Sequence, residues 1–174
     1  MGTPTESPAS SALCETPHTR TMAALDIGSN SFHLVVARRV NSDFQFLERE
    51  KVQIQLATGL NHKNELDATM IKQAMKCLDQ LSAIIKEYQP DTVRAVATHT
   101  LRIASNSKQF IEAAQEHFPA PIEIVSGAEE ARLIYQGVAH LSNIREQTLV
   151  IDIGGGSTEF IIGADFRERA VHSS

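Results

Sequence analysis

The chain has 174 residues, of which 42% are hydrophobic and 21% charged, enough for one domain with a sizeable core and too few for two ordinary domains. Its net charge of −5 means that the chain as a whole does not attract nucleic acid, so no nucleic-acid partner is expected. Any polyanion that it binds must be held by local hydrogen-bond donors or by a metal. No apolar run reaches membrane-spanning length, so no transmembrane segment is expected either.

The first 21 residues are rich in Pro, Ser and Thr and lack the apolar centre of a secretory signal. This composition predicts a disordered tail over residues 1–21. The two cysteines are Cys14, in this tail, and Cys77, in a helical pattern. A disulfide framework is therefore not expected. We expect a reducing compartment, and so a cytoplasmic location.

Residues 22–28, 31–40 and 43–54 form a predicted three-stranded meander. The first segment is apolar and stops at a glycine, and the third alternates apolar and polar side chains as a strand with one wet face does. Asp67 is the expected N-cap of a helix that runs to about Tyr88 and stops before Pro90.

Strands and helices alternate after this helix. Strands are predicted at 93–98 and 121–126, with a helical stretch between them that ends at Phe118 and breaks near Asn106 and Ser107. Residues 127–140 predict a further helix with Leu133, Ile134 and Val138 on its apolar side. The pattern indicates an α/β fold with a mixed sheet over residues 22–140.

Residues 141–174 predict the start of a second domain of the same kind. A strand, a glycine turn and another strand occupy 148–163. The apolar side chains of this hairpin would need helices to bury them, and the remaining residues are too few to form those helices. We therefore expect the chain to be a truncated or partial one.

The segment "LDIGSNSFHLVV" at Leu25 returns as "IDIGGGSTEFII" at Ile151, without a gap. Backbone N–H groups around such turns, together with hydroxyl side chains, suit phosphate oxygens, and glycine allows a positive φ and a close approach to a ligand. An aspartate at each strand end suits Mg²⁺. A plain β-hairpin is the alternative for either copy alone, and the absence of a lysine after the glycines excludes the GxxxxGK[ST] loop.

Four segments together resemble the exopolyphosphatase / guanosine pentaphosphate phosphohydrolase (Ppx/GppA) family, within the actin-like superfamily. They are "ALDIGSNSFHLVVARRV", "VATHTLR", "PIEIVSGAEEARLIYQGVAH" and "LVIDIGGGSTEFIIG". The resemblance implies an actin-like (ribonuclease H-like) domain with a mixed five-stranded sheet, followed by the opening hairpin of a second such domain. It also implies that the two hairpins face each other across the phosphates of a substrate.

The resemblance assigns a role to each motif. Glu130 would be the general base, whereas Glu129 is read as compensating the helix dipole. Asp152 and Glu159 would bind Mg²⁺, and Asp26 takes the place of Asp152 in the first copy. The expected phosphate-binding positions are Gly28, Ser29, Asn30, Ser31, Arg102, Gly154, Gly155, Gly156, Ser157 and Thr158.

The expected activity is Mg²⁺-dependent hydrolysis of the terminal phosphoanhydride of inorganic polyphosphate. Alternatives that stay open are removal of the 5′-terminal phosphate of guanosine pentaphosphate, ATP-dependent phosphotransfer, and an inactive N-terminal fragment. The resemblance is compatible with a homodimer formed through domains C-terminal to these residues. It is also compatible with a peripheral position at a membrane. His99 is read as structural.

Overall fold

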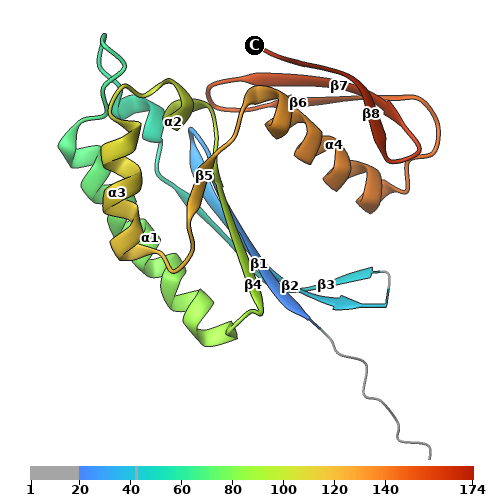
Figure 1. Ribbon diagram of the computed structural model, residues 1–174, viewed down its shortest axis with the longest axis horizontal. Coiled ribbons are helices and arrows are strands. Elements are labelled where there is room, and N and C mark those ends of the chain that lie inside the picture. Colours follow the sequence, from blue (N-terminus) through green and yellow to red (C-terminus); the bar gives the residue numbers. More distant parts are fainter. Residues whose placement is uncertain (1–19, 42) are drawn as a thin grey trace, which may run out of the picture.

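The computed structural model describes residues 20–41 and 43–174. A five-stranded sheet with strand order β3-β2-β1-β4-β5 and a three-stranded sheet with order β6-β7-β8 form its framework (Figure 1). The predicted α/β class and mixed five-stranded sheet are confirmed. The predicted disordered tail and Cys14 lie outside the described residues, except that Arg20 is described and Thr21 begins the first strand.

The large sheet begins with the predicted meander. Strands β1 (Thr21–Ile27), β2 (Ser31–Val40) and β3 (Asp43–Gln53) pair antiparallel. Strands β4 (Thr92–Ala97) and β5 (Ile122–Ile124) extend the sheet in parallel on the other side of β1. Leu25 and Ile27 of β1 are buried, so Asp26 between them points from the opposite face.

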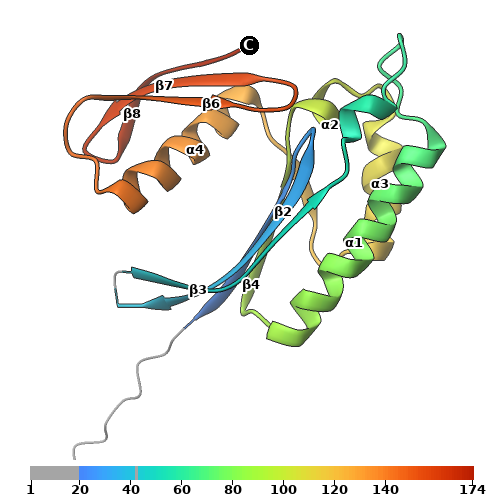
Figure 2. The same cartoon turned by 180° about the vertical axis from the view of Figure 1, so that it is seen from behind.

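Helices cover one face of this sheet. Helices α1 (Ala68–Tyr88) and α3 (Ser107–His117) lie together on it, with η1 (Leu56–Gly59) and the short α2 (His99–Ile103) near the end where β1 stops (Figure 2). Asp67 caps α1 as predicted, its carboxylate accepting from the Met70 N–H at 2.8 Å. The other face of the sheet, which carries Asp26, is free of these helices.

The second sheet packs on one helix. Helix α4 (Gly127–Ser142) lies against strands β7 (Thr158–Ala164) and β8 (Arg167–Ser173), which continue the sheet from β6 (Thr148–Ile153) (Figure 1). The helix thus lies within the stretch expected to belong to the first domain, but packs with the second hairpin. Ile161 of β7 is buried against it.

The apolar side predicted for α4 is only partly right, since of its three residues Ile134 alone packs against the buried cluster of this helix. The buried side chains are Ala131, Tyr135 and Ala139, whereas Leu133, Ile134 and Val138 are only half-buried. The helix turns the side with two alanines to the small sheet, where short side chains allow the backbones to approach closely.

The outer face of the small sheet is apolar and open. Leu149, Ile151 and Ile153 are 54%, 50% and 80% exposed, while Ile161 on the inner face is fully buried. Among the described residues, no helix is long and apolar enough to cross a membrane.

Candidate active site

The two repeated segments have the same turn geometry. The Gly28 N–H donates to the Ser31 carbonyl at 3.2 Å, and the Gly154 N–H donates to the Ser157 carbonyl at 3.0 Å. Before each turn an aspartate lies opposite a residue of the next strand, Asp26 opposite His33 and Asp152 opposite Glu159. The repeat in the sequence is therefore a repeat in structure.

The two turns touch each other. A Cβ placed on Gly155 would lie 2.9 Å from the Asn30 Cβ, and one on Gly156 would lie 2.8 Å from the Ser29 Oγ and 2.7 Å from the His99 Cδ2. These glycines are thus required by the contact between the loops. The expected positive φ is wrong, because no described glycine has one.

A cavity of about 320 Å³ opens where the turns meet. Most of the predicted site residues line it: Asp26, Gly28, Ser29, Asn30, Ser31, Glu130, Asp152, Gly154, Gly155, Gly156 and Ser157. His33, Lys51, Thr98 and Ile153 line it as well. Lys51 was not singled out from the sequence, because nothing in the local pattern sets the pairing of β3 with β2. Thr98 lies in the quoted segment "VATHTLR" but was given no role there.

Three predicted residues do not line this cavity. Thr158 follows Ser157 into β7. Arg102 of α2 lies behind Glu130, where its Nη1 donates at 3.0 Å both to the Glu130 Oε2 and to the Val125 carbonyl. Glu159 is fully buried and accepts from the Ser173 Oγ at 2.9 Å, and its Oε2 has no hydrogen-bond partner in the described part of the chain.

The first turn uses its hydroxyls to hold itself in place. The Thr100 Oγ1 donates to the Ser29 Oγ at 2.7 Å, and the Ser31 Oγ is hydrogen-bonded to the His33 Nε2 at 2.7 Å. Within residues 20–41 and 43–174, the backbone N–H groups of Asn30, Gly155 and Gly156 donate to no protein acceptor. Unpaired donors on both turns, at the wall of one cavity, suit an anion.

Three carboxylates surround the same space. Burial and the nearby charge of Asp152 raise the pKa of Asp26 to about 6. Burial also raises the pKa of Glu130, as do the charges of Glu159 and Asp26, while the hydrogen bond from Arg102 opposes this rise. Because like charges disfavour ionisation, the group is more stable when a proton or a cation lies between its members.

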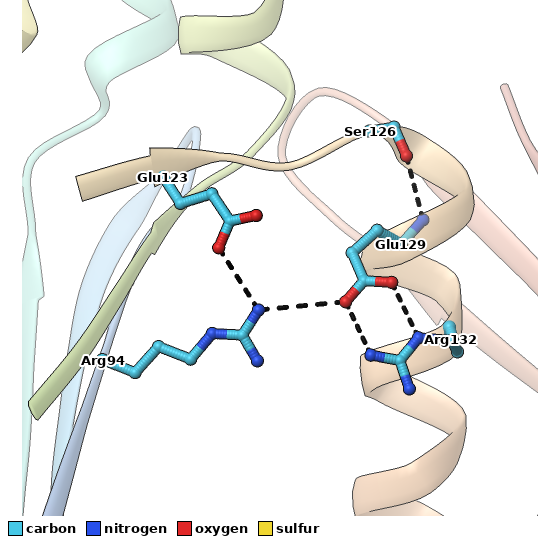
Figure 3. A network of polar contacts seen from close by, with 5 residues as sticks. All are labelled: Arg94, Glu123, Ser126, Glu129 and Arg132. Atoms are coloured by element: carbon cyan, nitrogen blue, oxygen red, sulfur yellow. Dashed lines mark hydrogen bonds and ion pairs between the residues drawn. The ribbon is translucent and has the colours of Figure 1, made fainter. Parts of the chain in front are cut away.

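Glu129 and Glu130, adjacent in the sequence, have different surroundings. The Glu129 carboxylate accepts from the Arg132 Nε and Nη2 at 2.7 and 2.6 Å, and Arg94 of β4 approaches it at 3.8 Å (Figure 3). Arg132 lowers its pKa. Glu130 has a side chain 13% exposed at the cavity wall. Helix α4 therefore uses one glutamate in an ion-pair network and leaves the other facing the site.

The acids partly fit a divalent cation. Asp26 and Asp152 reach the cavity from the ends of β1 and β6, and their mutual repulsion is the feature that a cation would relieve. Among the described residues there is no cluster of three or more ligand side chains. Mg²⁺ commonly binds one or two carboxylates and completes its shell with waters and substrate phosphates, so a pair suffices. Glu159 lies opposite Asp152 in the pairing of β6 with β7, but it is fully buried and does not line the cavity.

Comparisons with known proteins assign the chain to a family. The model of the Ppx/GppA phosphatase family matches residues 35–174. An Aquifex aeolicus Ppx/GppA family member is similar in structure with a TM-score of 0.81 and 28% identity, over 90% of this chain and 51% of that one. An exopolyphosphatase from Cytophaga hutchinsonii is similar with a TM-score of 0.84 and 30% identity, over 89% of this chain and 50% of that one.

The chain thus spans about half the length of these solved relatives. The family match covers both α4 and the second glycine hairpin, which carry Glu130 and Asp152. The resemblance seen in the four sequence segments is confirmed. The chain belongs to the Ppx/GppA phosphatase family.

Proposed function

We propose that this site hydrolyses the terminal phosphoanhydride of inorganic polyphosphate and releases orthophosphate. The observation that carries the proposal is the meeting of the two turns at one cavity whose wall holds unpaired backbone N–H groups and the Glu130 carboxylate. Donors for phosphate oxygens and a base for water are the two components that such a hydrolysis requires.

Glu130 is the proposed general base. Arg102 holds its Oε2, and the second oxygen is the one left to accept a proton from a water molecule. As that water forms a bond to the terminal phosphorus, the bond from phosphorus to the bridging oxygen breaks, and the shortened chain leaves with the electron pair. The N–H groups of Asn30, Gly155 and Gly156 are suited to hold the oxygens of the transferred phosphoryl group.

Asp26 and Asp152 are the proposed ligands of Mg²⁺, and the magnesium requirement is part of the proposal. When bound, the cation would neutralise charge on the phosphate oxygens. The raised pKa of Asp26 means that protons compete with the cation at mildly acid pH. Glu159, also expected to bind metal, remains a candidate that would have to reach the cation from a buried position.

The substrate is tested by measuring phosphate release from long-chain polyphosphate, guanosine pentaphosphate and ATP, each with Mg²⁺ and with excess chelator. We expect release from polyphosphate to be fastest and to depend on Mg²⁺. Faster release from guanosine pentaphosphate would move the assignment to the nucleotide. Transfer from ATP to an acceptor, without release of phosphate, would overturn the hydrolase.

Replacing Arg102 by alanine is expected to move the acid limb of the pH–rate profile to higher pH. Arg102 lowers the pKa of Glu130, and the base must be ionised to act, so removing the guanidinium makes Glu130 protonate at a higher pH. If the limb moves by about one pH unit, the rate at a fixed pH below it falls about tenfold. The measurement is kcat against pH.

Arg102→Lys and Arg94→Ala are the controls for this change. The lysine retains the charge and is expected to move the limb less than alanine does. Arg94 pairs with Glu123 and Glu129 (Figure 3), so its removal should leave the limb in place. An unchanged limb in Arg102→Ala would show that Arg102 does not act through Glu130.

A further inference from the structure

A row of side chains crosses the large sheet from Asp26, a proposed Mg²⁺ ligand, to the edge strand β3. Asp26 of β1 lies opposite His33 of β2, and His33 lies opposite Lys51 of β3. Directly opposed residues point to the same face of a sheet, and neighbouring strands are about 4.8 Å apart. The backbone of Lys51 is therefore about 10 Å from that of Asp26, and both side chains reach the cavity.

An irregularity in β3 puts the lysine in this row. The pairing of β2 with β3 shifts by one residue between Val36 and Ala37, which leaves Leu47 as the extra residue of a β-bulge. Without the bulge, Glu50 would face His33. The bulge therefore exchanges an acid for a base on the cavity side of the strand.

Two acids of β3, Glu48 and Glu50, point away from the cavity. The Tyr88 hydroxyl, at the end of α1, donates to the Glu48 Oε2 at 3.2 Å. Burial and the nearby charge of Glu50 raise the pKa of Cys77, which lies in the same helix, to about 11. The run Glu48–Lys51 is thus sorted by strand alternation, with its acids towards α1 and its bases on the opposite face.

The Lys51 ammonium has no partner in the part of the chain that the structure describes: it forms no ion pair or side-chain hydrogen bond there. Among the residues that line the cavity it is the one with a permanent positive charge, against Asp26, Glu130 and Asp152. Arg49, the neighbouring base, lies instead 3.7 Å over the Phe46 ring.

The end of β3 is fixed to the first turn. The N–H groups of Ile54 and Gln55 donate to the Asn30 carbonyl at 3.0 and 2.7 Å, and the Ala57 N–H donates to the Ser29 carbonyl at 3.1 Å. The strand that carries Lys51 is therefore held in register with the loop that would bind the scissile phosphate. The unpaired Lys51 ammonium, held on a fixed strand, is therefore positioned to bind an anionic group.

We propose that Lys51 is a specificity-determining residue that binds phosphoryl groups beyond the one being hydrolysed. The inference rests on the proposed function, since it places the rest of the anionic chain along the row from Asp26 to Lys51. A single phosphate held by the two turns does not extend that far. Lys51 thus favours substrates with several consecutive phosphates.

Binding to the Glu130→Gln variant tests this without turnover. Calorimetric titration with long-chain polyphosphate and with orthophosphate is done for Glu130→Gln alone and with Lys51→Ala or Lys51→Arg added. We expect Lys51→Ala to weaken polyphosphate binding about tenfold, as loss of one charge-assisted contact does, and orthophosphate binding less than twofold. The salt dependence of polyphosphate binding should also become shallower, because one fewer ion pair forms.

Lys72→Ala in the same background is the matched control, since Lys72 is exposed on α1, on the other side of the sheet. It should bind both ligands as Glu130→Gln does, and Lys51→Arg should retain most of the affinity. Equal losses for the two ligands, or none, would overturn the role of Lys51 while leaving the site intact. If Glu130→Gln itself binds no polyphosphate, the proposed function fails first. Far-UV circular dichroism verifies folding of every variant.

Discussion

Glu130→Gln is expected to lower the rate of phosphate release by roughly 10²–10⁴-fold, the usual contribution of a general base. Glutamine keeps the shape of the side chain and can still accept a hydrogen bond from Arg102, so the fold should be retained. It cannot accept the proton of the attacking water. The measurement is kcat on polyphosphate with saturating Mg²⁺, alongside the melting temperature.

Glu129→Gln is the matched control, because it makes the same chemical change one residue earlier. Its carboxylate is held by Arg132 and Arg94 and does not line the cavity (Figure 3). We expect nearly normal turnover and only a small fall in melting temperature, because a partly exposed ion pair stabilises the fold little. If Glu129→Gln abolished turnover and Glu130→Gln did not, the assignment of the base would be reversed.

Gly156→Ala is expected to reduce turnover by about 100-fold, because it separates the two turns. The added methyl group would lie within 3 Å of the Ser29 Oγ and of the His99 ring, and Ser29 is buried and hydrogen-bonded to Thr100. Ser29 therefore cannot swing away freely, and relief of the clash requires a loop to move. A displacement of about 1 Å of a positioning group can cost 10²-fold in rate.

The same change should cost about 1–3 kcal/mol of unfolding free energy, as overpacking does. Gly137→Ala is its control, since Gly137 is exposed on α4 and a Cβ there meets nothing within 4 Å. That variant should retain turnover and gain about 0.5–1 kcal/mol, because alanine is the better helix former. Normal turnover in Gly156→Ala would show that contact between the turns is not needed for activity.

The local sequence predicted the framework of the site well. Alternating and helical periodicities located the meander, the helix capped by Asp67 and the break before Ser107, because each is set by neighbouring residues along the chain. The repeat itself predicted two turns with Asp26 and Asp152 at matching positions, and the structure brings both to one cavity. The roles of these residues remain predictions until turnover is measured.

Packing between distant segments decided the rest. The apolar side of α4 was not predicted correctly, because Leu133 and Tyr135 both suit a buried face and only the partner sheet selects one. Arg102 was expected at the phosphate, but its guanidinium lies against the Glu130 carboxylate and the Val125 carbonyl, both contributed by residues far along the chain.

The register of β3 could not be predicted from the local sequence. The order of residues along the chain is enough to put the acids and bases of Glu48 to Lys51 on alternate faces of a strand, since side chains alternate in any extended chain. It does not say which of the two faces meets the cavity. A one-residue bulge at Leu47 exchanges the two faces, and its position depends on pairing with β2 and packing against α1.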